Sequence, residues 1–487
     1  MCLRLALVAT LIGGLIAGVA AAIPESIQSL IDEGQWTEAR AQLAAVAEQT
    51  DDEAQRDELL FEAERLRRIG LDFRWTGEQM LEGIQETLPD ATMEDVDRWR
   101  EEGWIQHFVI DGEIRYFPRD ARNLFRRNPA AQGRREAVMP VLDPENMSDM
   151  RKMTSGLEAH VQAIIAEAQG DEDGLVCPER YRVTYTLTVN PGEVPEGETI
   201  RCWVVYPREE PHMTDIELLW TDPEEHVVAP PDTPQRSIYL ERPSNGDEPT
   251  EFQVCYEYTA WGFYREIDPE GIEPYDTESE LYRRYTAEEP PHIVFTPEIT
   301  RLVEEVVGDE TNPYLKAERI YAWMDENVPW IGEREYSTIP NISDLCLRRH
   351  AGDCGVQAIL FITLCRAADV PARWESGWQM EPGSEGLHDW ARFYVEPHGW
   401  LWSDPTYDYR PQWRGEAAQH FYFGNIDAWR LVANSAFSQE FVPPKEHFRS
   451  ETVDFQRGEV EWAGGNLFFD QWGYDMEVEH LGRPEGL

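Results

Sequence analysis

The sequence RHAGDCGVQAILFITLCRAADVPARWESGWQMEPGSEGLHDWARFYVEPHGWLWSDPTYDY, at residues 349–409, carries the strongest structural signals of the chain. From Cys354 to Cys365 it contains no Pro and has apolar residues on every face, as expected of a helix buried in a core. Unpaired N–H groups and the helix dipole at its first turn favour a thiolate, and can bring a Cys pKa from about 8.5 down to roughly 3.5–7.5. The same N–H groups can hold an oxyanion, so the sequence predicts an activated nucleophile at Cys354.

Two strands are predicted after this helix, and each carries a polar residue suited to catalysis. Residues 388–395 and 400–406 flank the turn Pro397-His398-Gly399, so they are expected to pair side by side and antiparallel. Counted from the turn, His388 and Asp404 lie at comparable but unequal distances. We therefore expect the two side chains to meet.

The three residues fit the logic of a catalytic triad with cysteine as nucleophile, in which a carboxylate orients an imidazole that takes the thiol proton. The motifs GDCG, PAR, SGW, HDW and GWLWSDPT, in this order, resemble the core of the transglutaminase-like superfamily, which is similar to papain-type cysteine proteases. The resemblance implies a papain-like α+β core with Cys354 as nucleophile, His388 as base and Asp404 as orienting acid. It also suggests an aromatic donor to the oxyanion, for which Trp330 and Tyr336 are candidates, although a role in the core or at the rim is favoured for each.

A zinc site is the main alternative use of these residues, because Cys346, His350 and Cys354 occur at four-residue spacing. Zinc would need a fourth ligand, and Gly352-Asp353 would interrupt a helix carrying all three. Cys365 lies about 16 Å along the helix from Cys354 and is expected in the core. We predict no metal and no cofactor, and the lack of a CxxC motif disfavours a redox role.

The charge of the chain restricts its partners. It has 93 acidic against 43 basic residues, a net charge of −50, and its lysines are Lys152, Lys316 and Lys445 alone. This balance argues against nucleic acids and anionic membrane surfaces as partners. It suggests a protein that works in salt, which screens self-repulsion, or a source with a high-GC genome, or simply a solvated acidic surface.

The first 22 residues resemble a secretory signal peptide. Residues 5–22 are almost wholly apolar, Arg4 precedes them, and Ala20-Ala21-Ala22 forms an A-x-A cleavage site. An uncleaved anchor remains the alternative, because the run nearly spans a bilayer. The sequence thus predicts a periplasmic or extracellular protein. Six cysteines would remain after cleavage, and we predict no disulfide, since Cys202 and Cys255 differ in the strand faces they occupy.

The rest of the chain divides into four predicted regions, which make an α+β multidomain protein. Residues 23–170 are mostly helical, with a hairpin at Asp111-Gly112 that is also compatible with a winged-helix-like unit. Short alternating strands predict an antiparallel β-sandwich at 175–270. The transglutaminase-like core is expected at 275–435, and residues 436–487 are expected to form a C-terminal extension.

The predicted function is that of an exported, thiol-dependent acyl-transfer enzyme acting on amide bonds of a protein or peptide substrate. Hydrolysis is favoured over crosslinking, because water is abundant outside the cytoplasm and nothing in the sequence forms an amine-binding pocket. The alternative is a non-catalytic binding or scaffold protein that keeps the fold. The sequence leaves the substrate and the oligomeric state open.

Overall fold

The computed structural model describes residues 23–138, 144–171, 173–407 and 420–484. The predicted signal peptide, residues 1–22, lies outside this part. Within the described ranges, no helix combines the length and the apolar character needed to cross a membrane. The chain divides into two compact units, residues 1–124 and 125–487.

The first unit is mainly helical. Its apolar core includes Leu43 and Leu59, which are fully buried. Two helices begin with capping boxes, at Thr76 with Gln79 and at Thr92 with Asp95. The helices of this unit are α1 (Glu25–Asp32), α2 (Trp36–Glu48), α3 (Glu53–Asp72), α4 (Gly77–Gln85) and α5 (Met93–Glu101), and α6 (Asp120–Arg127) crosses the boundary.

A hairpin of strands β1 (His107–Ile110) and β2 (Glu113–Tyr116) completes the first unit. Its turn residues Asp111 and Gly112 have φ of 49° and 83°. This is the left-handed conformation that an Asp-Gly turn between two strands requires. The predicted Asp-Gly hairpin is thus present.

The second unit contains the predicted core. A five-stranded antiparallel sheet has the order β12-β11-β10-β9-β13. Its strands are β9 (Ala372–Gln379), β10 (Gly386–Val395), β11 (Gly399–Ser403), β12 (Phe423–Gly424) and β13 (Arg430–Asn434). Helix α13 (Cys354–Ala367) packs on this sheet, and residues Gly355 to Arg366 are all buried. A helix that is apolar on every face is therefore a core helix here, as the sequence predicted.

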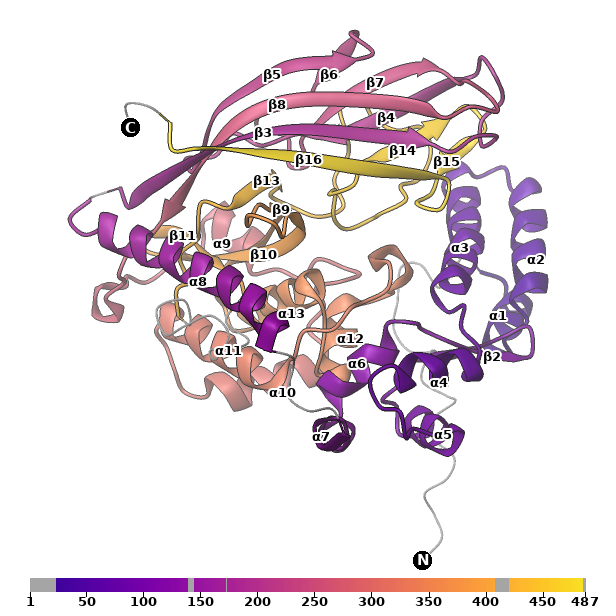
Figure 1. Cartoon of the computed structure of the whole chain (residues 1–487), viewed down its shortest axis with the longest axis horizontal. Helices are drawn as coiled ribbons and strands as arrows, with labels where there is room; N and C mark the ends of the chain where they lie inside the picture. Colours follow the sequence, from indigo (N-terminus) through magenta and orange to yellow (C-terminus); the bar gives the residue numbers. More distant parts are fainter. Residues whose placement is uncertain (1–22, 139–143, 172, 408–419, 485–487) are drawn as a thin grey trace, which may run out of the picture. The chain divides into compact units, whose positions relative to one another are not determined.

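The second unit has other helices, and those at 297–307, 313–327 and 342–349 pack against α13. Thr296 and Asn312 cap α10 and α11 through their side chains, and each of these helices has a proline in its first turn. The helices are α7 (Pro129–Val138), α8 (Pro144–Glu167), α9 (Glu280–Tyr285), α10 (Pro297–Val307), α11 (Pro313–Asn327) and α12 (Ile342–Arg349) (Figure 1).

The predicted antiparallel β region forms two further sheets, with the orders β15-β14-β4-β7-β6 and β16-β3-β8-β5. Tyr206 and Tyr256 join them at a ring distance of 5.2 Å, and Tyr185 stacks on Trp378 of the core sheet at 5.4 Å. Their strands are β3 (Leu175–Val189), β4 (Thr199–Val205), β5 (Met213–Asp222), β6 (His226–Val228), β7 (Ser237–Pro243), β8 (Thr250–Phe263), β14 (Glu459–Trp462), β15 (Gly465–Leu467) and β16 (Trp472–Gly482). The α+β class predicted from the sequence is confirmed.

The end of the chain belongs to these two sheets. Residues 436–487, expected as an extension, supply β14 beside β4, β15 beside β14, and β16 beside β3, where Figure 1 shows β16 in yellow. A strand must pair its backbone groups with a neighbour, and the neighbours here lie far away in the sequence. Local sequence patterns therefore place the strands at 175–270 but not those that complete the sheets.

Candidate active site

Cys354 is the first residue of α13, as predicted. The N-cap residue Asp353 accepts a hydrogen bond from Val356 N at 3.2 Å, which fixes the start of the helix. Gly352 is required just before it, because a Cβ there would lie 2.4 Å from Val356 Cγ1. The GDCG motif therefore has a local structural reason that is separate from chemistry.

His388 and Asp404 are in direct contact. The β10–β11 hairpin pairs Ala391 with Ser403, so His388 on β10 comes beside Asp404, which directly follows β11. His388 Nε2 lies 2.7 Å from Asp404 Oδ2, and both residues are at most 5% exposed. A buried charge-assisted hydrogen bond of this length is short and strong.

Asp404 is held by further donors. Arg430 donates to Oδ2 at 2.9 Å, and the Thr406 hydroxyl donates to Oδ1 at 2.8 Å. Burial alone would raise the pKa of Asp404, but the charges of His388 and Arg430 outweigh it and lower the pKa to about 2. The carboxylate is therefore ionised at every pH at which the protein would work.

Arg430 is a residue of the site that sequence reasoning missed. It is 1% exposed, and its Nε and second terminal nitrogen bind Asp427 Oδ2 at 3.2 and 3.0 Å. Its guanidinium also lies over the Tyr407 ring at 4.4 Å. Arg430 thus joins Asp404 to a second buried carboxylate. Its position at the start of β13 carried no local signal.

The hydrogen-bond partner of Cys354 Sγ is Asp389, the residue after His388. Sγ lies 3.3 Å from Asp389 Oδ2, and the Asp389 backbone N–H also donates to the sulfur. Among the hydrogen bonds of the described residues, none joins Sγ to the His388 ring. The structure therefore brings His388 and Asp404 together, and places Cys354 against the peptide that joins His388 to Asp389.

The lowered thiol pKa expected at this helix terminus was wrong for the structure. Burial raises the pKa of Cys354 well above its usual value, and the carboxyl groups of Asp389 and Asp353 act in the same direction. Burial likewise raises the pKa of Asp389, with Asp353 adding to the effect. Burial, together with two neighbouring carboxyl groups, thus outweighs the helix dipole, and the motif did not reveal these surroundings.

Tyr336 contacts the first residues of α13, beside Cys354. Its hydroxyl accepts from Gly355 N at 3.1 Å and lies 2.7 Å from Asp353 Oδ1. Gly355 allows this contact, because a Cβ there would be 2.5 Å from the Tyr336 hydroxyl. Tyr336 is thus in the site, but its hydroxyl already binds Asp353.

The backbone of Cys354 provides a donor of its own. The next three N–H groups of α13 are used by the Tyr336 hydroxyl, the Asp353 side chain and the Asp353 carbonyl. In the described part of the chain, Cys354 N–H donates to no acceptor. This is the donor expected of an oxyanion hole at a helix start.

The C-terminal segment reaches the site through Gln456. Its side-chain amide donates to the His388 carbonyl at 2.8 Å and to Asp389 Oδ1 at 2.7 Å. Trp378 Nε1 holds the Gln456 carbonyl at 2.9 Å. The segment before β14 therefore fixes both residues of the His-Asp pair in the HDW motif.

The other residues singled out from the sequence, Cys365 and Trp330, make packing contacts outside the reacting group. Cys365 is fully buried in α13, and the Arg126 guanidinium lies over the Trp330 ring at 4.8 Å. The cysteines described, from Cys177 to Cys365, are free thiols. In residues 23–138, 144–171, 173–407 and 420–484, no group of three or more His, Cys, Asp or Glu side chains is arranged to hold a metal ion.

A known protein family matches the stretch of the chain that contains Cys354, His388 and Asp404. Residues 300–405 match the transglutaminase-like superfamily. The chain carries a transglutaminase-like domain. The domain includes Cys354 and His388 and ends just after Asp404, whereas Arg430 and Gln456 lie beyond it. The prediction of this family from the sequence is confirmed.

Solved structures similar to the chain include a suspected cysteine protease from Cytophaga hutchinsonii, with 15% identity, a TM-score of 0.42, and coverage of 64% of this chain and 93% of that one. The periplasmic domain of TgpA from Pseudomonas aeruginosa is similar at 17% identity and a TM-score of 0.28, with coverage of 53% and 95%. Neither likeness bears on the activity of this chain. A comparison with curated proteins finds no match.

Proposed function

We propose that the chain is an exported thiol enzyme that cleaves amide bonds in a protein or peptide substrate, with Cys354 as nucleophile, His388 as base and Asp404 as orienting acid. The observation that carries the proposal is the buried His388–Asp404 pair at 2.7 Å, next to a cysteine that begins a core helix of the transglutaminase-like domain. Export is supported by the apolar residues 5–22.

The reaction begins with transfer of the thiol proton to His388. Asp404 holds Nε2, so the other ring nitrogen, Nδ1, takes the proton from Sγ. The thiolate attacks the amide carbonyl, and Cys354 N–H stabilises the oxyanion that forms. The amide C–N bond then breaks, the imidazolium returns its proton to the leaving amine, and a thioester remains on Cys354.

Water completes the cycle. His388 takes a proton from water, the resulting hydroxide attacks the thioester, and the carboxylic acid leaves while Sγ recovers its proton. A primary amine in place of water would instead form a new amide and make the enzyme crosslink. We favour water, because it is always present outside the cytoplasm.

Asp389 has a distinct part in this scheme. Its carboxyl contacts Sγ in the resting site, so the thiol proton is held on the Asp389 side before the reaction. Substrate binding must then favour the alternative contact of the thiol with His388. Gln456 donates to the Asp389 carboxyl, and the Tyr336 hydroxyl lies 3.3 Å from it, which keeps this resting arrangement well defined.

The alternative function is a non-catalytic binding or scaffold protein. The contact between Sγ and Asp389, together with the raised thiol pKa, favours it, because both keep Cys354 uncharged. A binding role does not need the buried His388–Asp404 pair, whereas catalysis does. An activity that depends on the reacting residues therefore separates the two functions.

The test is a product analysis by mass spectrometry. The protein is incubated with a panel of glutamine-containing peptides, with and without methylamine, and compared with Cys354→Ala and with Cys177→Ala, a half-buried thiol outside the domain. Peptide cleavage or conversion of glutamine to glutamate, lost in Cys354→Ala and kept in Cys177→Ala, supports the hydrolase. Incorporation of methylamine without hydrolysis would overturn the choice of water.

A further inference from the structure

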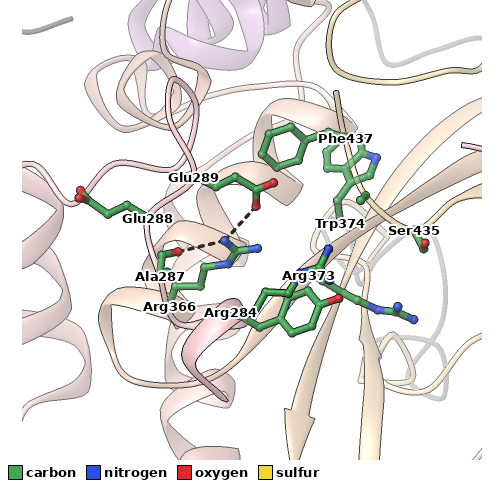
Figure 2. Close-up of a pocket in the computed structure, with 11 residues that line it drawn as sticks. Arg284, Ala287, Glu288, Glu289, Arg366, Arg373, Trp374, Ser435 and Phe437 are labelled. Atoms are coloured by element: carbon green, nitrogen blue, oxygen red, sulfur yellow. Dashed lines mark hydrogen bonds and ion pairs between the residues drawn. The ribbon is translucent and has the colours of Figure 1, made fainter. Parts of the chain in front are cut away.

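A cavity of about 310 Å³ lies away from the candidate active site. It is lined by residues at the end of α9 and just after it, by the end of α13, by the start of β9 and by the residues after β13 (Figure 2). Arg366 on this cavity and Cys354 are twelve residues apart on α13, which corresponds to about 18 Å. The cavity is therefore separate from the reacting groups.

Three arginines line the cavity, Arg284, Arg366 and Arg373, and the Arg373 guanidinium also lies over the Trp400 ring at 4.8 Å. Such a group of arginines is unusual in a chain with 93 acidic and 43 basic residues. Two acidic residues also line it, but Glu288 accepts from Phe295 N and points away from the other residues in Figure 2. Glu289 is thus the carboxylate within the cavity that faces the arginines.

Arg366 is 4% exposed and only partly satisfied. Its Nε donates to the Ala372 carbonyl at 2.9 Å, and one terminal nitrogen donates to the Ala287 carbonyl and to Glu289, both at 3.0 Å (Figure 2). The second terminal nitrogen has no acceptor among the described residues and is not fully enclosed, so it is open to an anion in the cavity.

The charged groups around Arg366 and Arg373 also bear on anion binding. Burial lowers the pKa of Arg366, Glu289 opposes this through its charge and hydrogen bond, and the charge of Arg284 adds a smaller lowering effect. Arg373 Nε is buried without a partner in the described part of the chain. Its nearest carboxylate, Glu375, lies 3.9 Å away and also binds Arg392 and the Trp390 ring nitrogen. The cavity lining therefore sets three arginines against Glu289 and against Glu375, a carboxylate that Arg373 shares with Arg392.

The remaining walls are apolar. Trp374 and Phe437 are at most 3% exposed as residues and meet edge to face at 6.4 Å. A cavity of this volume is at the small end of the range for ligand sites, roughly 300–1,000 Å³. Guanidinium groups recognise carboxylates through paired N–H donors, and aromatic rings favour an apolar body.

We infer that this cavity binds a small organic carboxylate, with its carboxylate on the guanidinium groups of Arg366 and Arg373 and its apolar part against Trp374 and Phe437. Arg284, which is exposed on α9, would lie on the same side of the cavity as the bound carboxylate. The inference does not depend on the proposed catalytic function, because it involves none of the three reacting residues.

The test is ligand-observed NMR and calorimetry with benzoate as the probe, and with benzamide and inorganic phosphate as comparison molecules. The variants are Arg373→Gln and Arg284→Gln, and the matched control is Arg283→Gln, the neighbouring arginine of α9 that does not line the cavity. Arg366 is left intact because its hydrogen bonds hold two backbone segments. Thermal unfolding establishes that each variant is folded.

Benzoate is expected to bind the wild type and the Arg283→Gln control equally, and to bind Arg373→Gln about tenfold more weakly. Benzamide is expected to bind far less than benzoate. Absence of benzoate binding to the wild type, equal binding of benzamide, or unchanged binding to both cavity variants would overturn the inference. Tighter binding of inorganic phosphate than of benzoate would overturn the assignment to an organic carboxylate.

Discussion

Asp389 is the single residue whose charge most directly affects the candidate nucleophile. Its carboxyl is buried 3.3 Å from Sγ, and its negative charge raises the pKa of Cys354. We expect Asp389→Asn to lower the midpoint of Cys354 alkylation by iodoacetamide by roughly one to three pH units.

The pH dependence of alkylation, followed by peptide mapping, measures this midpoint. Asp247→Asn, on an exposed turn, serves as the matched control and should leave the midpoint unchanged. If Asp389→Asn and the wild type have the same profile, Asp389 does not control the thiol.

Asp404 links the site to acid stability. Its pKa is lowered from 3.8 to about 2 in the folded protein. A lowered carboxyl pKa contributes stability that is fully present above about pH 4 and is lost as the pH falls towards about 2. We expect Asp404→Asn to reduce the free energy of unfolding at neutral pH by about 2 kcal/mol.

Urea unfolding at several pH values checks this expectation. The difference between wild type and Asp404→Asn should shrink as the pH falls through that window. A difference that stays constant down to pH 2 would mean that the carboxylate charge is not the source of the stability.

The candidate residues of the site differ in how far sequence could identify them. Cys354, His388 and Asp404 stand in short motifs that can be recognised in one sequence. Arg430 comes from a strand 26 residues beyond Asp404, and its role depends on a pairing that no motif records. The same is true of Asp389, whose effect on the thiol depends on the distance between two side chains.

At the scale of elements, the close contact of β9 with β13 depends on Gly377. A Cβ at this position would lie 2.0 Å from the Leu431 carbonyl of β13, a backbone atom that cannot move without breaking the pairing. We expect Gly377→Ala to lower the free energy of unfolding by about 2–3 kcal/mol. Gly386→Ala on β10, where nothing lies within 4 Å of a Cβ, is the control.

Thermal and urea unfolding of both glycine variants provide the measurement. Because β13 carries Arg430, loss of the β9–β13 contact should also reduce amide cleavage in Gly377→Ala. Equal stability of the two variants would show that the strands can separate without cost.

Most elements could be predicted from local patterns, because each has a local cause. The start of α13 follows from Asp353 as N-cap, and the β10–β11 hairpin follows from two alternating runs around a turn. Strands β14 and β16 were not assigned to the β region, because their partners β4 and β3 lie far earlier in the chain. Pairing over such distances is decided by the packed core and leaves little local signal.

For the whole molecule, the dominant property is its net charge of −50. Self-repulsion of this size destabilises the compact state, and salt screens it within about 10 Å at 0.1 M. We therefore expect Tm to rise by several degrees between low salt and about 1 M NaCl. Differential scanning calorimetry at fixed pH, with sucrose as an uncharged control, checks this, and a Tm that falls with salt would contradict it.

Pre-steady-state acylation by p-nitrophenyl acetate shows whether Cys354, His388 and Asp404 act as one reacting unit. If they do, the reaction gives a burst of about one equivalent of p-nitrophenol, with the acetyl group mapped to Cys354. The burst should vanish in Cys354→Ala and become slower in His388→Gln and Asp404→Asn. A burst that persists in Cys354→Ala, or an acetyl group on another residue, would mean that the three residues do not form such a unit.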